Sequence, residues 1–106
     1  MAKILSIVMS GEKAKIKMAL NFTSEMLKQG KDVKLMFWGP SEGVIAEDAE
    51  LQEGLKKVSE VLHPLACINF ARNNNLEEKL KGKVDLQPIG KYIAESVDDG
   101  YSILSF

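Results

Sequence analysis

The chain lacks the side chains that most metal sites and disulfide scaffolds need. Its 106 residues include one cysteine, Cys67, and one histidine, His63. A single cysteine cannot form an intramolecular disulfide, which excludes a disulfide scaffold and a cysteine-rich zinc site. We therefore predict neither a metal nor another cofactor. A lone thiol is typical of a reducing compartment, so we expect a cytoplasmic protein.

The chain also lacks an excess of charge of one sign and a long hydrophobic run. Its 14 Lys and Arg residues nearly balance 15 Asp and Glu residues, which gives a net charge of -1. A nucleic-acid-binding surface normally needs a basic excess, so we expect no nucleic-acid partner. No apolar run approaches the ~18 residues of a membrane span, so we expect no membrane partner. The apolar segment 4–9 lacks a cleavage site and fits a first strand better than a signal peptide.

The remaining composition is that of an ordinary folded protein. The chain is 45% hydrophobic and 27% charged, and its length suits one domain spanning residues 1–106. Short apolar runs predict five strands, at residues 4–9, 33–38, 65–68, 84–87 and 101–106. Helical periodicity lies between them, at residues 12–29, 41–62 with a break near 46–49, 69–80 and 90–98. This alternation predicts an α/β fold with a mostly parallel five-stranded sheet and helices on both faces.

In such a sheet, ligands bind outside the carboxyl ends of the strands. The predicted strand ends place four loops there: Ser10–Gly11, Gly39–Pro40, Cys67–Asn69 and Pro88–Gly90. The Ser10–Gly11 loop has neither the P-loop spacing nor the dinucleotide-binding spacing. We therefore rank a small-nucleotide-binding domain last among the hypotheses for the function.

Cys67 is the most informative residue on this edge. A free cysteine is often a buried core residue. However, Cys67 stands at the end of a predicted strand and before a predicted helix, where the helix dipole favours a thiolate, and Arg72 could add positive charge. A thiolate without a second cysteine can hold sulfane sulfur as a persulfide or act as an acyl or peroxide nucleophile. His63 precedes the same strand, ~13 Å away along it, so we expect no Cys–His dyad.

Other large side chains fit a core role. Of Phe37 and Trp38, one should face the core and the other can reach the edge of the sheet. The spacing of Met9, Met18, Met26 and Met36 predicts core filler rather than a cofactor site.

Several segments, taken in order, resemble the DsrE/DsrF-like family: residues 3–10, 18–22, 33–40, 67–72 and 100–106. The resemblance implies a three-layer α/β/α sandwich and homo-oligomers, often trimers or hexamers. It also implies sulfur relay, in which a cysteine accepts sulfane sulfur as a persulfide and passes it to a partner. Cys67 matches the family's cysteine after the third strand, and Asn69 and Arg72 match positions where the family keeps polar or basic residues.

Two hypotheses follow for the function. In the first, Cys67 is the acceptor of a sulfurtransferase or sulfur carrier. Ser10, Gly11, Gly39, Asn69 and Arg72 then help to bind the sulfur substrate. Its partners would be further copies of the chain and a sulfur donor or acceptor protein. In the second, the chain is a non-enzymatic oligomeric binding module, and Cys67 is structural.

Overall fold

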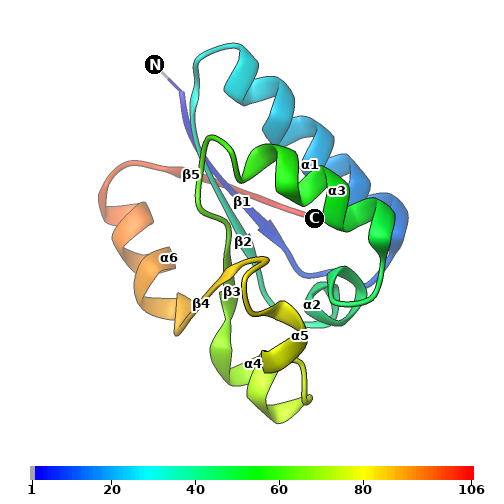
Figure 1. The fold of residues 1–106 in the computed structure, drawn as a ribbon. Coiled ribbons are helices and arrows are strands. Elements are labelled where there is room, and N and C mark those ends of the chain that lie inside the picture. Colours follow the sequence, from blue (N-terminus) through cyan, green and yellow to red (C-terminus); the bar gives the residue numbers. More distant parts are fainter. Residues whose placement is uncertain (1) are drawn as a thin grey trace.

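The computed structural model describes residues 2–106 and forms one five-stranded sheet (Figure 1). The strands are β1 (Lys3–Val8), β2 (Asp32–Phe37), β3 (Leu65–Cys67), β4 (Asp85–Gln87) and β5 (Ser102–Ser105). Their spatial order is β4-β3-β2-β1-β5, and every neighbouring pair is parallel. The α/β fold and the number of strands predicted from the alternating pattern are confirmed.

Six helices connect these strands. They are α1 (Lys13–Lys28), α2 (Pro40–Ile45), α3 (Ala49–Val58), α4 (Ile68–Asn73), α5 (Glu77–Leu80) and α6 (Ile89–Asp98). The segment expected to hold one or two helical turns, 69–80, contains α4 and α5. Asn75 lies between these two helices with a φ of 57°, a left-handed conformation that asparagine tolerates well.

The helices form from the periodic apolar positions that the sequence displays. Buried residues of α1 recur three or four apart, at Ile16, Ala19, Leu20 and Thr23. Gly30 follows that helix with a φ of 74°, as expected for a left-handed stop. No side chain caps the start of α1, and Ser10 Oγ accepts the amide of Glu12 at 3.0 Å, one residue before the helix begins.

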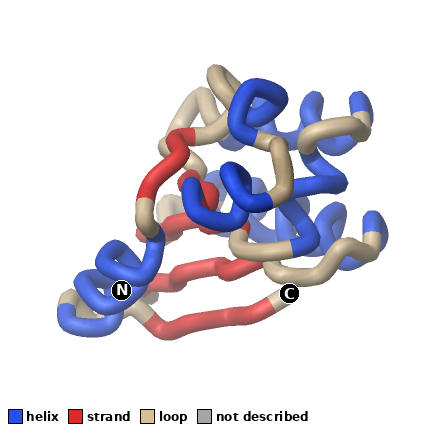
Figure 2. The backbone as a smooth tube through the Cα atoms, turned by 90° about the horizontal axis from the view of Figure 1, so that it is seen from below, coloured by secondary structure: helices blue, strands red, loops and turns tan. Residues whose placement is uncertain are grey.

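Two apolar cores lie on opposite faces of the sheet and give the molecule three layers (Figure 1). The first core joins Leu35 and Phe37 of β2 to residues of α1 and α3, including Leu20 and Leu55. The second core joins Met36, the residue between them, to Ile89 of α6. Because side chains alternate along a strand, one strand serves both cores. Figure 2 shows the strands between helices, with β5 at the edge of the sheet.

At the carboxyl ends of the neighbouring strands β3 and β4, the chain turns toward opposite faces of the sheet. After β3 the chain enters α4, whose Ala71 packs into the first core. After β4 it enters α6, whose Ile89 packs into the second core, and it returns beside β1 as β5. Open α/β sheets bind ligands at such a divergence between neighbouring strands.

The edge strand β5 is open to solvent. All four of its residues are exposed, and Ile103 and Leu104 retain 45% and 41% of their accessible surface. None of the helices formed by residues 2–106 combines the length and apolar character that a membrane crossing requires.

Candidate functional site

Cys67 is the last residue of β3 and lies at the divergence between β3 and β4. It is in register with Gln87, the last residue of β4. It also directly precedes α4, so its main chain is extended and turns there into the helix. The sequence-based position of Cys67, at the carboxyl edge of the sheet, is confirmed.

The thiol is more enclosed than a freely presented nucleophile. Cys67 is 7% exposed and belongs to the second core, beside Leu5, Met36 and Ile89. Phe70 of α4, one helical turn further on, packs against this core as well. Access to the sulfur in one chain is therefore narrow.

Glu42 of α2, which no sequence motif singled out, is a fully buried carboxylic acid. None of its surface is exposed. Its Oε2 accepts the amide of Gly39 at 3.0 Å, and its own amide donates to the Gly39 carbonyl at 2.9 Å. Its Oε1 has no hydrogen-bond partner among residues 2–106. A buried carboxyl with one oxygen unsatisfied is costly, and such groups concentrate at functional sites.

The ionisation of Glu42 is set by its burial and by nearby main-chain amides. Burial raises the pKa of the Glu42 carboxyl from 4.5 to about 7, while the main-chain amides of Gly39 and then Cys67 oppose this rise. The amide of Cys67 thus faces the carboxyl from β3, and the amide of Gly39 faces it from the end of β2. At neutral pH the Glu42 carboxyl is therefore populated in both its neutral and its charged form, which is a requirement for a group that exchanges protons at that pH.

Gly39 is required by the turn that holds Glu42 in place. Its φ of 101° lies in the region that favours glycine. The turn is fastened to β1, because Ser41 Oγ donates to the Val8 carbonyl at 2.6 Å and the Ser41 amide donates to the Met9 carbonyl at 3.1 Å. Gly39 was expected to help bind the substrate; in the structure its amide binds Glu42.

The Ser10–Gly11 loop lies against the Gly39–Pro40 loop. A Cβ on Gly11 would come within 3.3 Å of the Pro40 Cβ, so the glycine permits this close approach. Both the side chain and the main chain of Ser10 form hydrogen bonds. Its Oγ accepts the Glu12 amide, and its own amide donates to the Phe106 carbonyl at 3.2 Å. These two loops are brought together at the carboxyl edge, as the sequence predicts.

The two polar residues expected after Cys67 are exposed on α4. Asn69 faces solvent, and the Arg72 Nε lies 3.3 Å from Oε1 of Glu77 in α5. The structure thus directs the guanidinium of Arg72 to a neighbouring carboxylate.

Trp38 and Met9 extend the carboxyl edge with exposed apolar surface. They follow Phe37 and Val8, which pair with each other, and Phe37 also pairs with Ala66, the residue before Cys67. Trp38 is 45% exposed, whereas Phe37 is buried, so one of the two aromatic residues reaches the edge as expected. The prediction of core filler was wrong for Met9 and for Met18 in α1, because both are exposed.

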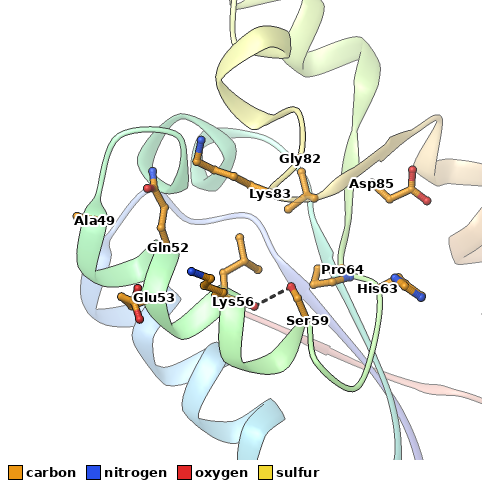
Figure 3. Close-up of a pocket in the computed structure, with 12 residues that line it drawn as sticks. Ala49, Gln52, Glu53, Lys56, Ser59, His63, Pro64, Gly82, Lys83 and Asp85 are labelled. Atoms are coloured by element: carbon orange, nitrogen blue, oxygen red, sulfur yellow. Dashed lines mark hydrogen bonds between the residues drawn. The ribbon is translucent and has the colours of Figure 1, made fainter.

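A groove lies at the opposite end of β3. Its volume is about 740 Å³, and it runs between α3 and the segment before β4 (Figure 3). His63 and Pro64 line it just before β3 begins, together with Lys56, Lys83 and Asp85. The separation of His63 from Cys67 is confirmed, so the groove and the thiol are distinct features. Within residues 2–106, the His, Cys, Asp and Glu side chains form no group of three that could hold a metal ion.

Comparisons with known proteins establish the fold. No protein-family model and no curated protein sequence matches this chain. Several solved chains are similar in structure, among them the following two. A conserved protein of unknown function from Bacteroides thetaiotaomicron has 19% identity and a TM-score of 0.82, over 98% of this chain and 95% of that one. A protein of unknown function from Methanobacterium thermoautotrophicum has 12% identity and a TM-score of 0.80, over the full length of both chains.

Proposed function

We propose that this protein is a DsrE-like sulfur-relay protein that accepts sulfane sulfur on Cys67 as a persulfide and passes it to a partner. The observation that carries the proposal is the position of Cys67: it ends β3 where the chain diverges, and its amide faces the buried carboxyl of Glu42. A cysteine at the carboxyl end of a parallel strand stands where open α/β sheets bind their ligands. The thiol needs a reducing compartment, which fits the cytoplasm.

The transfer is a thiol–persulfide exchange. The Cys67 thiolate attacks the outer sulfur of a donor persulfide, R–S–SH, and a new S–S bond forms while the donor's S–S bond breaks. The products are Cys67–S–SH and the donor thiolate R–S⁻. An acceptor nucleophile then attacks the outer sulfur, and Cys67 leaves as a thiolate. The outer sulfur of the persulfide lies ~2 Å beyond Sγ. It is therefore closer to the surface than Sγ and easier for an acceptor to reach.

The chain offers two surfaces for partners. We place the donor or acceptor protein at the exposed Trp38 and Met9 on the carboxyl edge, and a second copy of the chain at β5. An open edge strand carries unpaired main-chain groups, and Ile103 and Leu104 add apolar surface to it. The resulting homo-oligomer, a trimer or a hexamer by the family resemblance, stays a proposal.

Mass spectrometry tests the proposal directly. The native protein is incubated with a small persulfide donor, freed of reagent and weighed, beside the Cys67→Ser variant. We expect a gain of ~32 Da, one sulfur atom, in the natural sequence and no gain in the variant. An unchanged mass in both samples contradicts sulfur relay.

One observation favours the second hypothesis, a non-enzymatic oligomeric module. Cys67 is 7% exposed among apolar side chains, as expected for a structural cysteine. In that case the native thiol resists iodoacetamide until the protein is unfolded. Rapid alkylation of the native protein would count against a structural role.

A further inference from the structure

The groove at the amino end of β3 has the size and the lining of a small-molecule site. Its volume of about 740 Å³ lies within the ~300–1,000 Å³ range of ligand-binding pockets. Leu55, Pro64 and Val84 line it, although most of their own surface is buried. The groove thus offers a ligand an apolar floor, formed by these three residues, beneath a polar rim.

The wall of the groove that faces α3 is held by main-chain contacts. It is the turn that leads into β4 (Figure 3). The Asp85 amide donates to the Pro64 carbonyl at 2.9 Å, and a β-bridge joins Lys81 to Val84. Gly82 lies within this turn with a φ of 82°, and a Cβ added there would meet no atom within 4 Å. The wall is therefore preformed, with open space beside Gly82.

Two lysine side chains bring uncompensated positive charge to the groove. Lys56 lies on α3, and Lys83 lies on the facing turn (Figure 3). Within residues 2–106 neither ammonium group forms a salt bridge, and the Lys83 Nζ donates to the Lys79 carbonyl at 2.8 Å. The neighbouring Lys79 and Lys81, in contrast, each have a carboxylate partner. A bound anion would supply the partner that Lys56 and Lys83 lack.

The acidic residues of the lining are not paired with these lysines. Asp85 points away from α3, and its Oδ1 accepts the Gln87 side chain at 3.1 Å (Figure 3). Glu53 is exposed on α3, three residues before Lys56, and forms no ion pair with it in the part of the chain that the structure describes. An anion can therefore bind in the groove without breaking an existing ion pair.

We propose that this groove binds a small organic carboxylate with an apolar body. The ammonium groups of Lys56 and Lys83 hold the carboxylate from the two walls, while the apolar floor contacts the body of the ligand. An inorganic anion would gain little from exposed lysines, and a purely apolar ligand would leave both of them uncompensated. The groove lies at the opposite end of β3 from Cys67, so this inference does not depend on sulfur relay.

Two-dimensional ¹H–¹⁵N NMR of the labelled chain tests the inference with octanoate as the probe. We expect saturable shifts of the amide signals of Lys56, Gly82 and Val84, which line the groove. Acetate keeps the carboxylate and lacks the apolar chain, whereas 1-octanol keeps the chain and lacks the charge. Each of these two compounds should bind about tenfold more weakly than octanoate, or weaker still.

Variants with fewer lysines distinguish the groove from the general charge of the surface. Lys56→Gln combined with Lys83→Gln should weaken octanoate binding about tenfold, because each exposed ion pair contributes about threefold. Lys57→Gln is the matched control. It removes the next lysine of α3, which is also exposed but does not line the groove, and it should leave the affinity unchanged.

The outcomes are distinct. Shifts that do not saturate, shifts centred on Trp38 and Met9, or equal losses in Lys57→Gln and in the double variant would overturn the inference. Saturable binding that only the double variant weakens supports it, whatever the result of the ~32 Da test of sulfur relay. The same spectra report whether each variant is folded. Should the double variant not fold, each single variant should weaken binding about threefold, and an unchanged affinity in both would overturn the inference.

Discussion

Replacing the buried Glu42 with glutamine should make the protein more stable at pH 8 and change its stability much less at pH 5. The pKa of the carboxyl is 4.5 in an ordinary setting and about 7 in the folded chain, with burial as the main cause. Between these two values the folded protein binds more protons than the unfolded protein. The free energy of unfolding therefore falls as the pH rises through this window.

The magnitude follows from the size of the window. Each tenfold change in proton affinity corresponds to about 1.4 kcal/mol, so ionised Glu42 costs the folded state about 3 kcal/mol above pH 7. Part of this loss is already present at pH 5, which leaves about 2 to 3 kcal/mol between pH 5 and pH 8. Glutamine has nearly the shape of the protonated acid, and its carbonyl can still accept the Gly39 amide at the position of Oε2.

Urea denaturation at the two pH values measures the effect. The difference in the free energy of unfolding between Glu42→Gln and the natural sequence should grow by about 2 to 3 kcal/mol from pH 5 to pH 8. Contributions from other titrating groups cancel in this difference. Glu25→Gln should show no pH-dependent difference, because Glu25 is exposed on α1. Parallel stability curves for Glu42→Gln and the natural sequence would refute the burial argument.

Three further predictions concern the turn, the core and the sheet edge. Gly39→Ala should cost about 1 to 3 kcal/mol in thermal unfolding, because φ is 101° there, whereas Gly90→Ala in α6, with open space around it, should not destabilise. Leu55→Ala in α3 should cost about 2 to 5 kcal/mol in urea unfolding, and Val61→Ala, an exposed position, less than about 0.5 kcal/mol; equal losses would contradict the assigned core. For the proposed homo-oligomer, Ile103→Lys on β5 should lower the mass measured by light scattering to that of one chain, and an unchanged mass above that of one chain would place the interface elsewhere.

Most of the fold could be predicted from sequence because its signals are local. Apolar runs four to six residues long mark the strands, and helical spacing such as Leu51, Leu55 and Val58 marks the helices. The position of Cys67 follows from the same reasoning, since a strand ends there. Strand order depends on pairing between distant segments, such as β1 with β5, and no local pattern encodes it.

The burial of the site residues could not be predicted in the same way. Glu42 stands in a short helix, where a glutamate is normally solvated, and its burial results from the tertiary packing of α2. One local signal was present: a glutamate three residues after the Gly39 turn can bond back to that turn, as it does here. The exposure of Met9 likewise depends on tertiary packing, because Met9 lies just past the end of β1.

The shortness of β3 and β4 also bears on how a reagent reaches the sulfur. The two strands pair over three residues, and β4 has no further strand on its outer side. Short peripheral pairings separate more readily than the six-residue pairing of β1 with β2 at the centre. Local fraying of β4 should therefore uncover Cys67 without global unfolding. Amide hydrogen exchange at Leu86 and Gln87 would report how often this local opening of β4 occurs.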